Sequence, residues 1–294
     1  YPLYEQEQEA ISKRRMGLGI TGLANLLEAM GHTYGSKGFV EETTKILSTL
    51  RDHAYLASSN LAKEKGAFPL YRAEQYNKSG FIQTLPDHIR EEIRSNGIRN
   101  SHLLSIAPTG TISLAADNIS SGIEPVFSIR TNRVLRDFDT TSIIEIEDYG
   151  FRTFGIIPKI AEQVTPEEHL AVLAATSRLV DSAVSKTCNV PHDISWEDFK
   201  DIYYNAWRMG CKGCTTYRMG GKREAILTKI EEPKPEPGSL VLVDPTTYQP
   251  VKEYMSNLEW EKAQLEDLNT VPDNVACTYD PETGDRDRKS TRLN

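Results

Sequence analysis

The chain has 294 residues, of which 38% are hydrophobic and 26% are charged, as in ordinary globular proteins. Its formal net charge of −8 argues against a nucleic-acid polymer as partner, because proteins bind phosphate backbones with a surplus of lysine and arginine. No apolar run has the roughly 18 residues needed to cross a bilayer, so no membrane partner is expected. A small anionic ligand is compatible with this charge, since it needs only a local cradle.

The start of the chain and its cysteines indicate a broad class. Residues 1–6 lack the basic and apolar parts of a signal peptide, and no methionine opens the chain, so we expect a piece of a longer protein. The four cysteines are irregularly spaced and predict no disulfide framework. Reduced cysteines are typical of the cytoplasm, which is the expected location.

Two helices are predicted first, from apolar spacing and capping signals. One covers 43–65 and ends at Gly66. Its expected buried face consists of Ile46, Leu47, Leu50, Ala54, Ala57 and Leu61. The other opens with a capping box from Thr165 to Glu168, with Pro166 in the first helical position. Its expected buried residues are Leu170, Leu173, Val180 and Val184.

A third helix is predicted between the cap Ser195, with Asp198 three residues on, and Gly210. Its expected inward residues are Phe199, Ile202, Tyr203 and Ala206. Short apolar runs between the helices, such as 103–106, suit strands buried on both faces. Helices and strands that alternate over about 10–230 predict an α/β fold with a parallel sheet or barrel.

The composition changes after residue 230. Residues 231–238 are charged and rich in proline, which is typical of a linker that buries nothing. We therefore expect residues 231–294 to form a linker and a tail that is partly disordered. The abruptly basic stretch 286–292 is not expected to belong to the native fold.

Glycines 17, 19 and 22 match the spacing of the dinucleotide-binding fingerprint. That fingerprint requires a buried strand before the glycines, yet residues 11–15 are polar and basic. Close packing of a strand against a helix is therefore favoured over NAD binding as the reason for these glycines.

Cys211 and Cys214 have the spacing of a redox pair or half a zinc site. One such pair without a second pair or a nearby histidine gives no closed zinc site. Residues three apart in a strand point to opposite faces, so the two sulfurs are not expected to meet. Buried structural cysteines are the favoured interpretation. Cys188 and Cys277 are expected to be inert, and neither a metal site nor a role for the histidines is predicted.

The stretch 105–113 carries the strongest functional signal. A buried strand runs into Pro108, a small turn with two threonines, and a predicted helix start. Gly110 lets a ligand approach the backbone closely, and unpaired amides at a helix start form an anion site. By itself, this pattern is equally compatible with an ordinary turn between a strand and a helix.

Five segments together resemble the large subunit of ribonucleotide reductases. The family signature is matched by 99–101 (Arg-Asn-Ser), 107–113 (Ala-Pro-Thr-Gly-Thr-Ile-Ser) and 120–125 (Ser-Ser-Gly-Ile-Glu-Pro). An upstream arginine and glycine-rich segment, 14–24, and a final strand, 210–218, are similar as well. The family fold is a ten-stranded α/β barrel of two halves. The resemblance implies that residues 1–230 supply most of the second half.

The resemblance also implies a substrate site and a chemistry. The ribonucleotide phosphates, from a diphosphate or a triphosphate, would be held by Pro108, Thr109, Gly110, Thr111 and Ile112. The family replaces the ribose 2′-hydroxyl by hydrogen, using a cysteine radical within an Asn-x-Cys-x-Glu motif that this chain lacks. No catalytic residue is therefore assigned here, and the chain alone is expected to be inactive. The parent enzyme would use a dithiol reductant such as thioredoxin, and a homodimer is one compatible assembly.

Within the family, the last strand distinguishes two classes. Enzymes that receive a radical from a separate iron or manganese subunit carry two adjacent tyrosines there, whereas this chain has Thr216 before Tyr217. The loop and the last strand look more like the adenosylcobalamin-dependent class, so adenosylcobalamin is the implied cofactor. Two alternatives stay open: the large subunit of the two-protein class, and a non-catalytic nucleotide-binding α/β module.

Overall fold

The computed structural model describes residues 1–136, 141–218, 227–229, 240–243 and 250–255. The chain divides into two compact units, Tyr1–Tyr254 and Met255–Asn294, and nearly all described residues belong to the first. The predicted linker 231–238, Cys277 and the basic stretch 286–292 lie outside the described residues.

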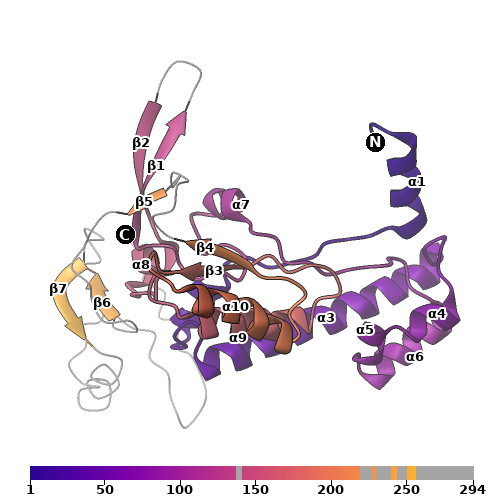
Figure 1. The fold of residues 1–294 in the computed structure, drawn as a ribbon. Coiled ribbons are helices and arrows are strands. Elements are labelled where there is room, and N and C mark those ends of the chain that lie inside the picture. Colours follow the sequence, from indigo (N-terminus) through magenta and orange to yellow (C-terminus); the bar gives the residue numbers. More distant parts are fainter. Residues whose placement is uncertain (137–140, 219–226, 230–239, 244–249, 256–294) are drawn as a thin grey trace, which may run out of the picture. The chain divides into compact units, whose positions relative to one another are not determined.

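The elements follow one another as Figure 1 labels them. The helices in the described part of the chain are α1 (Tyr4–Lys13), α2 (Leu23–Ala29), α3 (Lys37–Lys65), α4 (Ala73–Asn77), α5 (Gly80–Gln83), α6 (Asp87–Asn96), α7 (Gly110–Ala115), α8 (Tyr149–Phe154), α9 (Pro166–Ser177) and α10 (Trp196–Arg208). The strands are β1 (Arg130–Arg136), β2 (Thr141–Glu147), β3 (Thr187–Val190), β4 (Thr215–Arg218), β5 (Leu227–Lys229), β6 (Leu240–Val243) and β7 (Pro250–Met255).

Three extended segments run parallel through the main core. Leu18 forms a parallel bridge with Leu104, and Ile106 forms one with Val184. The predicted buried strand 103–106 is thus the middle segment, although its pairing is limited to these isolated bridges. Leu103, Leu104 and Ile106 are buried, so the expected burial on both faces is confirmed.

The third of these segments continues into β3, which pairs in parallel with β4 in the register Thr187↔Thr215. Helices α9 and α10 cover one face of this strand pair (Figure 1). Their shared apolar cluster consists of Leu170, Leu173, Cys188, Val190, Ile202 and Ala206. Helices packed on parallel strands confirm the predicted α/β class.

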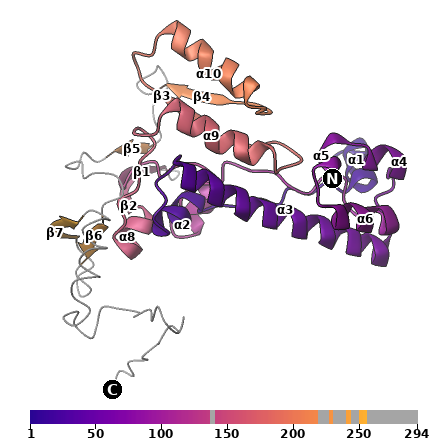
Figure 2. The ribbon, with the colours of Figure 1, turned by 90° about the horizontal axis from the view of Figure 1, so that it is seen from below.

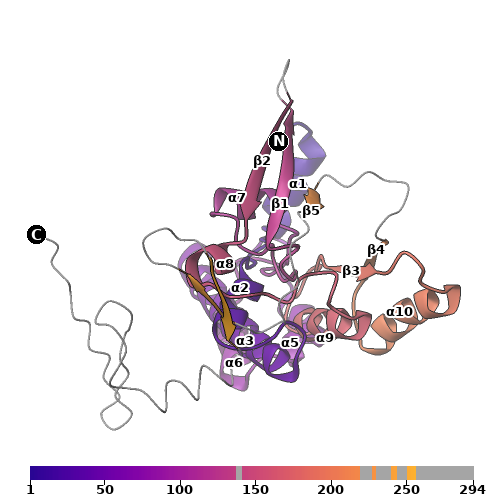
Figure 3. The same ribbon diagram turned by 90° about the vertical axis from the view of Figure 1, so that its left-hand side faces the viewer.

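A second, antiparallel sheet has the strand order β2-β1-β5. Figures 1 and 3 show β1 and β2 extending upward, away from α8, α9 and α10. Strands β6 and β7 form a separate two-stranded sheet inside the predicted tail. Antiparallel strands add to the predicted parallel ones, and apolar alternation alone did not indicate them.

Helix α3 begins earlier than predicted, at Lys37 instead of residue 43. The Ser36 side chain accepts a hydrogen bond from the amide of Phe39 and so caps the helix. Gly66 ends it, as predicted. Figure 2 shows α3 running from α2 to the group α4–α6.

The buried face of α3 also differs from the predicted one. It consists of Phe39, Thr43, Leu47, Arg51, Tyr55, Ser58, Ser59 and Ala62. Of the predicted residues only Leu47 is fully buried, and Ala57 and Leu61 are exposed. Buried hydrogen bonds account for this difference in the buried face. Ser59 donates to the carbonyls of Glu92 and Gly97, and Ser58 donates to Asn100. These partners decide which side of the helix faces the core.

The starts of α9 and α10 confirm the sequence signals, but their inward residues need correction. Thr165 and Glu168 form the capping box, and Ser195 accepts from the amide of Asp198. Helix α9 ends at Ser177, so Val180 and Val184 lie beyond it. The chain leaves the helix there because residues 182–185 pair with 104–106. Tyr203 of α10 is exposed, with its hydroxyl bonded to Thr216.

Candidate functional site

The turn before α7 has a backbone shape that is unusual for its sequence. Thr109 has φ 50° and ψ 18°, in the left-handed region that β-branched residues rarely adopt. The first helical bond runs from the amide of Ser113 to the carbonyl of Thr109. The amides of residues 110–112 therefore have no acceptor inside the helix. They lie in an exposed part of the chain.

The side chain of Thr109 holds this conformation in place. Its Oγ1 accepts a hydrogen bond of 2.6 Å from the amide of Gly122 and lies 2.9 Å from Oγ1 of Thr21. Thr21 in turn donates to the carbonyl of Ser120 at 3.0 Å. Three segments that are distant in sequence thus meet at one threonine. Such a network can maintain a strained backbone that the turn alone would not keep.

The glycines of 17–22 and Gly122 allow these segments to approach one another. A Cβ atom at Gly17 would lie 2.6 Å from Oγ of Ser105, and one at Gly19 would lie 2.4 Å from its carbonyl oxygen. A Cβ atom at Gly122 would lie 2.7 Å from the carbonyl oxygen of Ala107. Any side chain at these positions would push the strands and the loop apart, which supports the packing interpretation of the glycines.

A buried polar network that includes Asn25 and Asp148 holds the start of the segment 120–125 in place. Asn25 accepts from the amide of Ser120 at 2.6 Å and donates to both carboxylate oxygens of Asp148 at 3.0 Å. Asp148 also caps α8 by accepting from the amide of Phe151. Burial raises the pKa of Asp148 above its ordinary value. This network fixes the start of the segment that bonds to Thr109.

The predicted substrate residues form one continuous, accessible stretch. Pro108, Gly110 and Thr111 are exposed, and 62% of Ile112 is accessible. A Cβ atom at Gly110 would meet nothing within 4 Å, so the space above the turn is open. Sequence reasoning did not assign Thr21 and Gly122 to this site. Their only signal was membership in the motifs that resemble the family.

The three described cysteines are free thiols. Cys188 is buried on β3, and burial raises its pKa to about 12. Burial also raises the pKa of Cys211 and Cys214, which are half-buried. Strand β4 begins at Thr215, so Cys211 and Cys214 lie before it and pack against the same apolar cluster as Cys188. The prediction that they point to opposite faces of a strand was therefore wrong. Thiols that stay protonated at neutral pH are poor nucleophiles, in line with a structural role. No group of three or more histidine, cysteine or acidic side chains is placed to bind a metal within the described ranges.

Strand β4 is the segment that resembles the final barrel strand of the family. It has Thr216 and Tyr217 at the positions where a radical relay would need two adjacent tyrosines. Oγ1 of Thr216 lies 2.9 Å from the hydroxyl of Tyr203 on α10. Neighbouring residues of a strand point to opposite faces, so Tyr217 points away from this contact. Tyr203 thus does not replace the missing neighbour of Tyr217.

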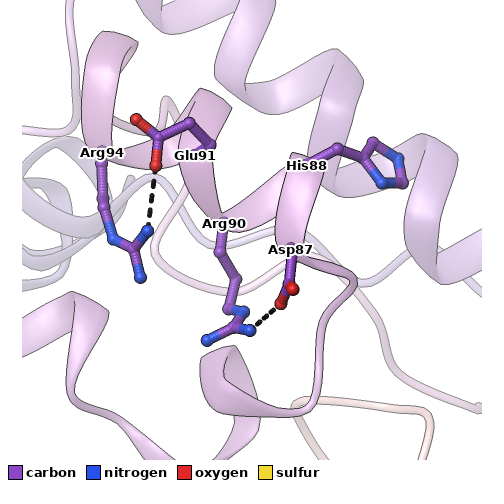
Figure 4. A pocket seen from close by; sticks show the side chains of 5 residues that line it. All are labelled: Asp87, His88, Arg90, Glu91 and Arg94. Carbon is purple, nitrogen blue, oxygen red and sulfur yellow. Dashed lines mark hydrogen bonds and ion pairs between the residues drawn. The ribbon is translucent and has the colours of Figure 1, made fainter.

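A separate surface hollow of about 470 Å³ lies along α6 (Figure 4). Two arginines line it, but each forms an ion pair with a carboxylate three residues earlier on the same helix: Arg90 with Asp87, and Arg94 with Glu91. These pairs leave little positive charge for an anionic ligand. The turn 107–112 is therefore the better candidate site.

Comparisons with known proteins agree with the fold class. Residues 1–153 and 152–217 match the family model "Ribonucleotide reductase, barrel domain". The parallel strands and the covering helices are those of an α/β protein, and the matching family model supports a fold of barrel type. The chain belongs to the ribonucleotide reductase family, through its barrel domain.

Relatives of the chain carry related names. It is 32% identical to the vitamin B12-dependent ribonucleoside-diphosphate reductase of Mycobacterium tuberculosis strain H37Rv, over 80% of this chain and 35% of the relative. The enzyme of the same name from Thermoplasma acidophilum is 30% identical, over 80% of this chain and 32% of the relative. The ribonucleoside-diphosphate reductase subunit alpha of Helicobacter pylori is 25% identical, over 77% and 30%. The chain thus spans about a third of the length of these relatives. Among the described helices, none has the length and apolar character to span a membrane.

Proposed function

We propose that this chain provides the part of a ribonucleotide reductase that holds the substrate phosphates. In this proposal residues 1–230 form the second half of the ten-stranded barrel, and residues 231–294 form a linker and tail. The substrate is a ribonucleoside diphosphate or triphosphate. The residues that bind its phosphates are Pro108, Thr109, Gly110, Thr111 and Ile112.

One observation carries the proposal: the first bond of α7 joins the amide of Ser113 to the carbonyl of Thr109, so the amides of the exposed residues 110–112 have no acceptor inside the helix. Amide groups that converge at a helix start bind anions through hydrogen bonds and the local dipole. Because Thr109 is tied to Thr21 and Gly122, the amides are already in place before a ligand arrives. Preorganised donors bind a phosphate without a further ordering cost.

The chain by itself is proposed to be inactive, because it contains no Asn-x-Cys-x-Glu motif for the radical cysteine. The complete enzyme would supply that loop, take electrons from a dithiol such as thioredoxin, and act in the cytoplasm, with a homodimer as one assembly. The role of this chain is then to bind the nucleotide, orient it and help to exclude water from the barrel interior.

In this proposal the cofactor is adenosylcobalamin, because β4 lacks the pair of adjacent tyrosines that the two-protein class needs. When bound, it supplies the initiating radical by cleavage of its cobalt–carbon bond. No aromatic relay is then needed, in agreement with Thr216 beside Tyr217 and with the contact between Thr216 and Tyr203. The vitamin B12-dependent names of the relatives from Mycobacterium tuberculosis and Thermoplasma acidophilum support the same class. We assign none of the described residues to corrin binding.

The proposal is tested with the complete reductase polypeptide and its Gly110→Val variant. Wild-type protein should reduce ribonucleotides when given adenosylcobalamin and a dithiol. The variant should fold normally, because a Cβ atom at residue 110 meets no protein atom within 4 Å, yet it should bind ribonucleotide more weakly. Unchanged affinity would remove the turn from the site. Activity only with an iron-loaded partner would favour the two-protein class, and binding without reduction would favour a nucleotide-binding module.

A further inference from the structure

The side chain of Lys186 is buried and contacts Glu124 of the segment 120–125. Lys186 is 3% exposed and lies directly before β3. Its Nζ donates to Oε2 of Glu124 at 2.9 Å, and to the carbonyl oxygen of Thr187 at 3.2 Å. It also lies 2.9 Å from Nδ1 of His169, and 5.3 Å from the ring centre of Tyr34. An ammonium has three donors, and all three have acceptors here.

The histidine in this cluster is neutral. Burial and, to a smaller extent, the nearby charges of Lys186 and Lys159 lower the pKa of His169 to about 2. Nδ1 accepts from the ammonium, so the ring proton is on Nε2, which is buried and has no hydrogen-bond partner among the described residues. Burial lowers the pKa of Lys186, and the charge and hydrogen bond of Glu124 oppose this shift. The cluster thus pairs one buried lysine, Lys186, with one carboxylate, Glu124.

Such a pair is a costly way to stabilise a core. Removing two charges from water costs several kcal/mol, and apolar residues of similar volume often stabilise a core as well or better. The pair instead fixes the position of the Glu124 carboxylate. Glu124 accepts from Lys186 through one oxygen and from the amide of Thr187 through the other, at 2.5 Å. Its carboxylate is therefore fixed to the start of β3.

Hydrogen bonds connect the backbone around Glu124 to the proposed phosphate-binding turn. Its amide donates to the carbonyl of Ser121 at 2.8 Å, and the carbonyl of Ile123 accepts from the hydroxyl of Tyr34 at 2.6 Å. Two residues before Glu124, the amide of Gly122 donates to Oγ1 of Thr109. A shift of Glu124 by one ångström would thus move the donor that holds Thr109 in its left-handed conformation.

We propose that Lys186 is a positioning residue which, through Glu124 and Gly122, sets the geometry of the turn that binds the ribonucleotide phosphates. This inference rests on the proposed function for its substrate, but the chain of hydrogen bonds from Lys186 through Glu124 and Gly122 to Thr109 is independent of it. Lys186 contacts neither the turn nor the space above it. Its effect is on the arrangement of amide donors and not on any reacting atom.

The test compares Lys186→Met with Lys159→Met in the complete reductase. Lys159 forms a part-buried ion pair with Glu168, at 2.5 and 2.6 Å, and so provides a matched loss of a lysine ammonium. We expect Lys186→Met to raise KM for the ribonucleotide by about tenfold and to change kcat much less, as for lost substrate binding. Lys159→Met should leave both constants near the wild-type values. Equal KM values in the two variants would overturn the inference.

A second variant and a second measurement keep the test decisive. Glu124→Gln removes the anion but retains most of the side-chain volume, so it serves if Lys186→Met does not fold. Hydrogen exchange of the amides of Ser113 and Gly122, which bond to the carbonyl and the hydroxyl of Thr109, should become about tenfold faster in either variant, since the turn loses its support. Unchanged exchange in Glu124→Gln would also overturn the inference. If wild-type enzyme neither binds nor reduces ribonucleotides, the proposed function fails, and the exchange result still decides the coupling.

Discussion

The hydroxyls of Thr21 and Thr109 lie 2.9 Å apart, although 88 residues separate them in the chain. The contact connects the glycine-rich segment before α2 to the turn before α7. Because the amide of Gly122 bonds to both hydroxyls, at 3.1 Å and 2.6 Å, a third segment joins at the same point. The conformation of the turn is thus a property of three segments together.

Thr109→Val should weaken both folding and nucleotide binding. Valine keeps the shape of threonine but removes one of the two acceptors for the amide of Gly122. We expect a loss of about 0.5–1.5 kcal/mol in the free energy of unfolding, the usual net contribution of one hydrogen bond, because the amide of Gly122 keeps its bond to Thr21. Ribonucleotide affinity should fall by about tenfold. Denaturant unfolding and calorimetric titration measure the two effects.

Thr44→Val is the control for this substitution. Thr44 donates to a carbonyl on an exposed part of α3, far along the chain from the turn. Its replacement should leave nucleotide affinity unchanged. An equal loss of affinity in both variants would mean that the hydroxyl of Thr109 has no special role.

Asp181 should be among the largest single contributors to stability in the main core. Its carboxylate accepts from the amides of Leu103 and Leu104, at 2.7 and 3.0 Å, and from the hydroxyl of Tyr55 at 2.7 Å. Asp181→Ala would leave these donors without their acceptor. We expect a loss of about 1–3 kcal/mol, the usual cost when part-buried donors lose a charged acceptor.

The matched control is Glu74→Ala, which breaks the exposed ion pair of Glu74 with Lys78. Surface pairs of this kind contribute about 0–1 kcal/mol. Chemical denaturation of both variants measures the difference, and a loss below 1 kcal/mol for Asp181→Ala would contradict the account of the core given above.

Glu28 should make the protein less stable as pH rises toward 8. Burial raises the pKa of Glu28 from 4.5 to about 8, and its Oε2 is buried without a hydrogen-bond partner in the described part of the structure. The folded state therefore binds more protons than the unfolded state between these values. Stability from this group is complete below pH 4.5 and is lost as pH rises through about 8.

Glu28→Gln should remove that part of the pH dependence, because the amide does not titrate. Thermal unfolding from pH 4.5 to pH 8.5, a range that spans both values, measures it. The wild-type protein should lose stability relative to the variant across this range. Parallel curves for the two proteins would show that Glu28 titrates near its ordinary value.

Tyr217→Phe tests the radical source. If a cofactor within the same polypeptide starts the reaction, no oxidisable ring is needed at residue 217. The complete enzyme with adenosylcobalamin should then retain its activity to within about threefold, or less than about 1 kcal/mol in the barrier. A loss of activity by several orders of magnitude would indicate a tyrosine relay and the two-protein class.

Local signals in the sequence predicted local features well. The capping box of Thr165 and Glu168, the cap Ser195 and the stop at Gly66 are each set by neighbouring residues, and each is confirmed. The α/β class follows from the alternation of helices with short apolar runs. These features depend on contacts within a few residues, which the order of the sequence displays directly.

Long-range polar contacts were not predictable in the same way. Lys186 and Glu124 are separated by 62 residues, and nothing in either neighbourhood indicates an ion pair. The buried face of α3 was misjudged because Ser58 and Ser59 find partners more than 30 residues away. The left-handed Thr109 likewise depends on Thr21 and Gly122. Each case requires knowledge of which distant segments meet.

The most direct test is a structure of the complete reductase with a bound ribonucleotide. We expect phosphate oxygens at about 3 Å from the amide nitrogens of residues 110–112, the distance of an ordinary hydrogen bond. Thr109 should keep its left-handed conformation in that complex. A nucleotide whose phosphates lie far from Thr109 and Gly110 would contradict the proposed site.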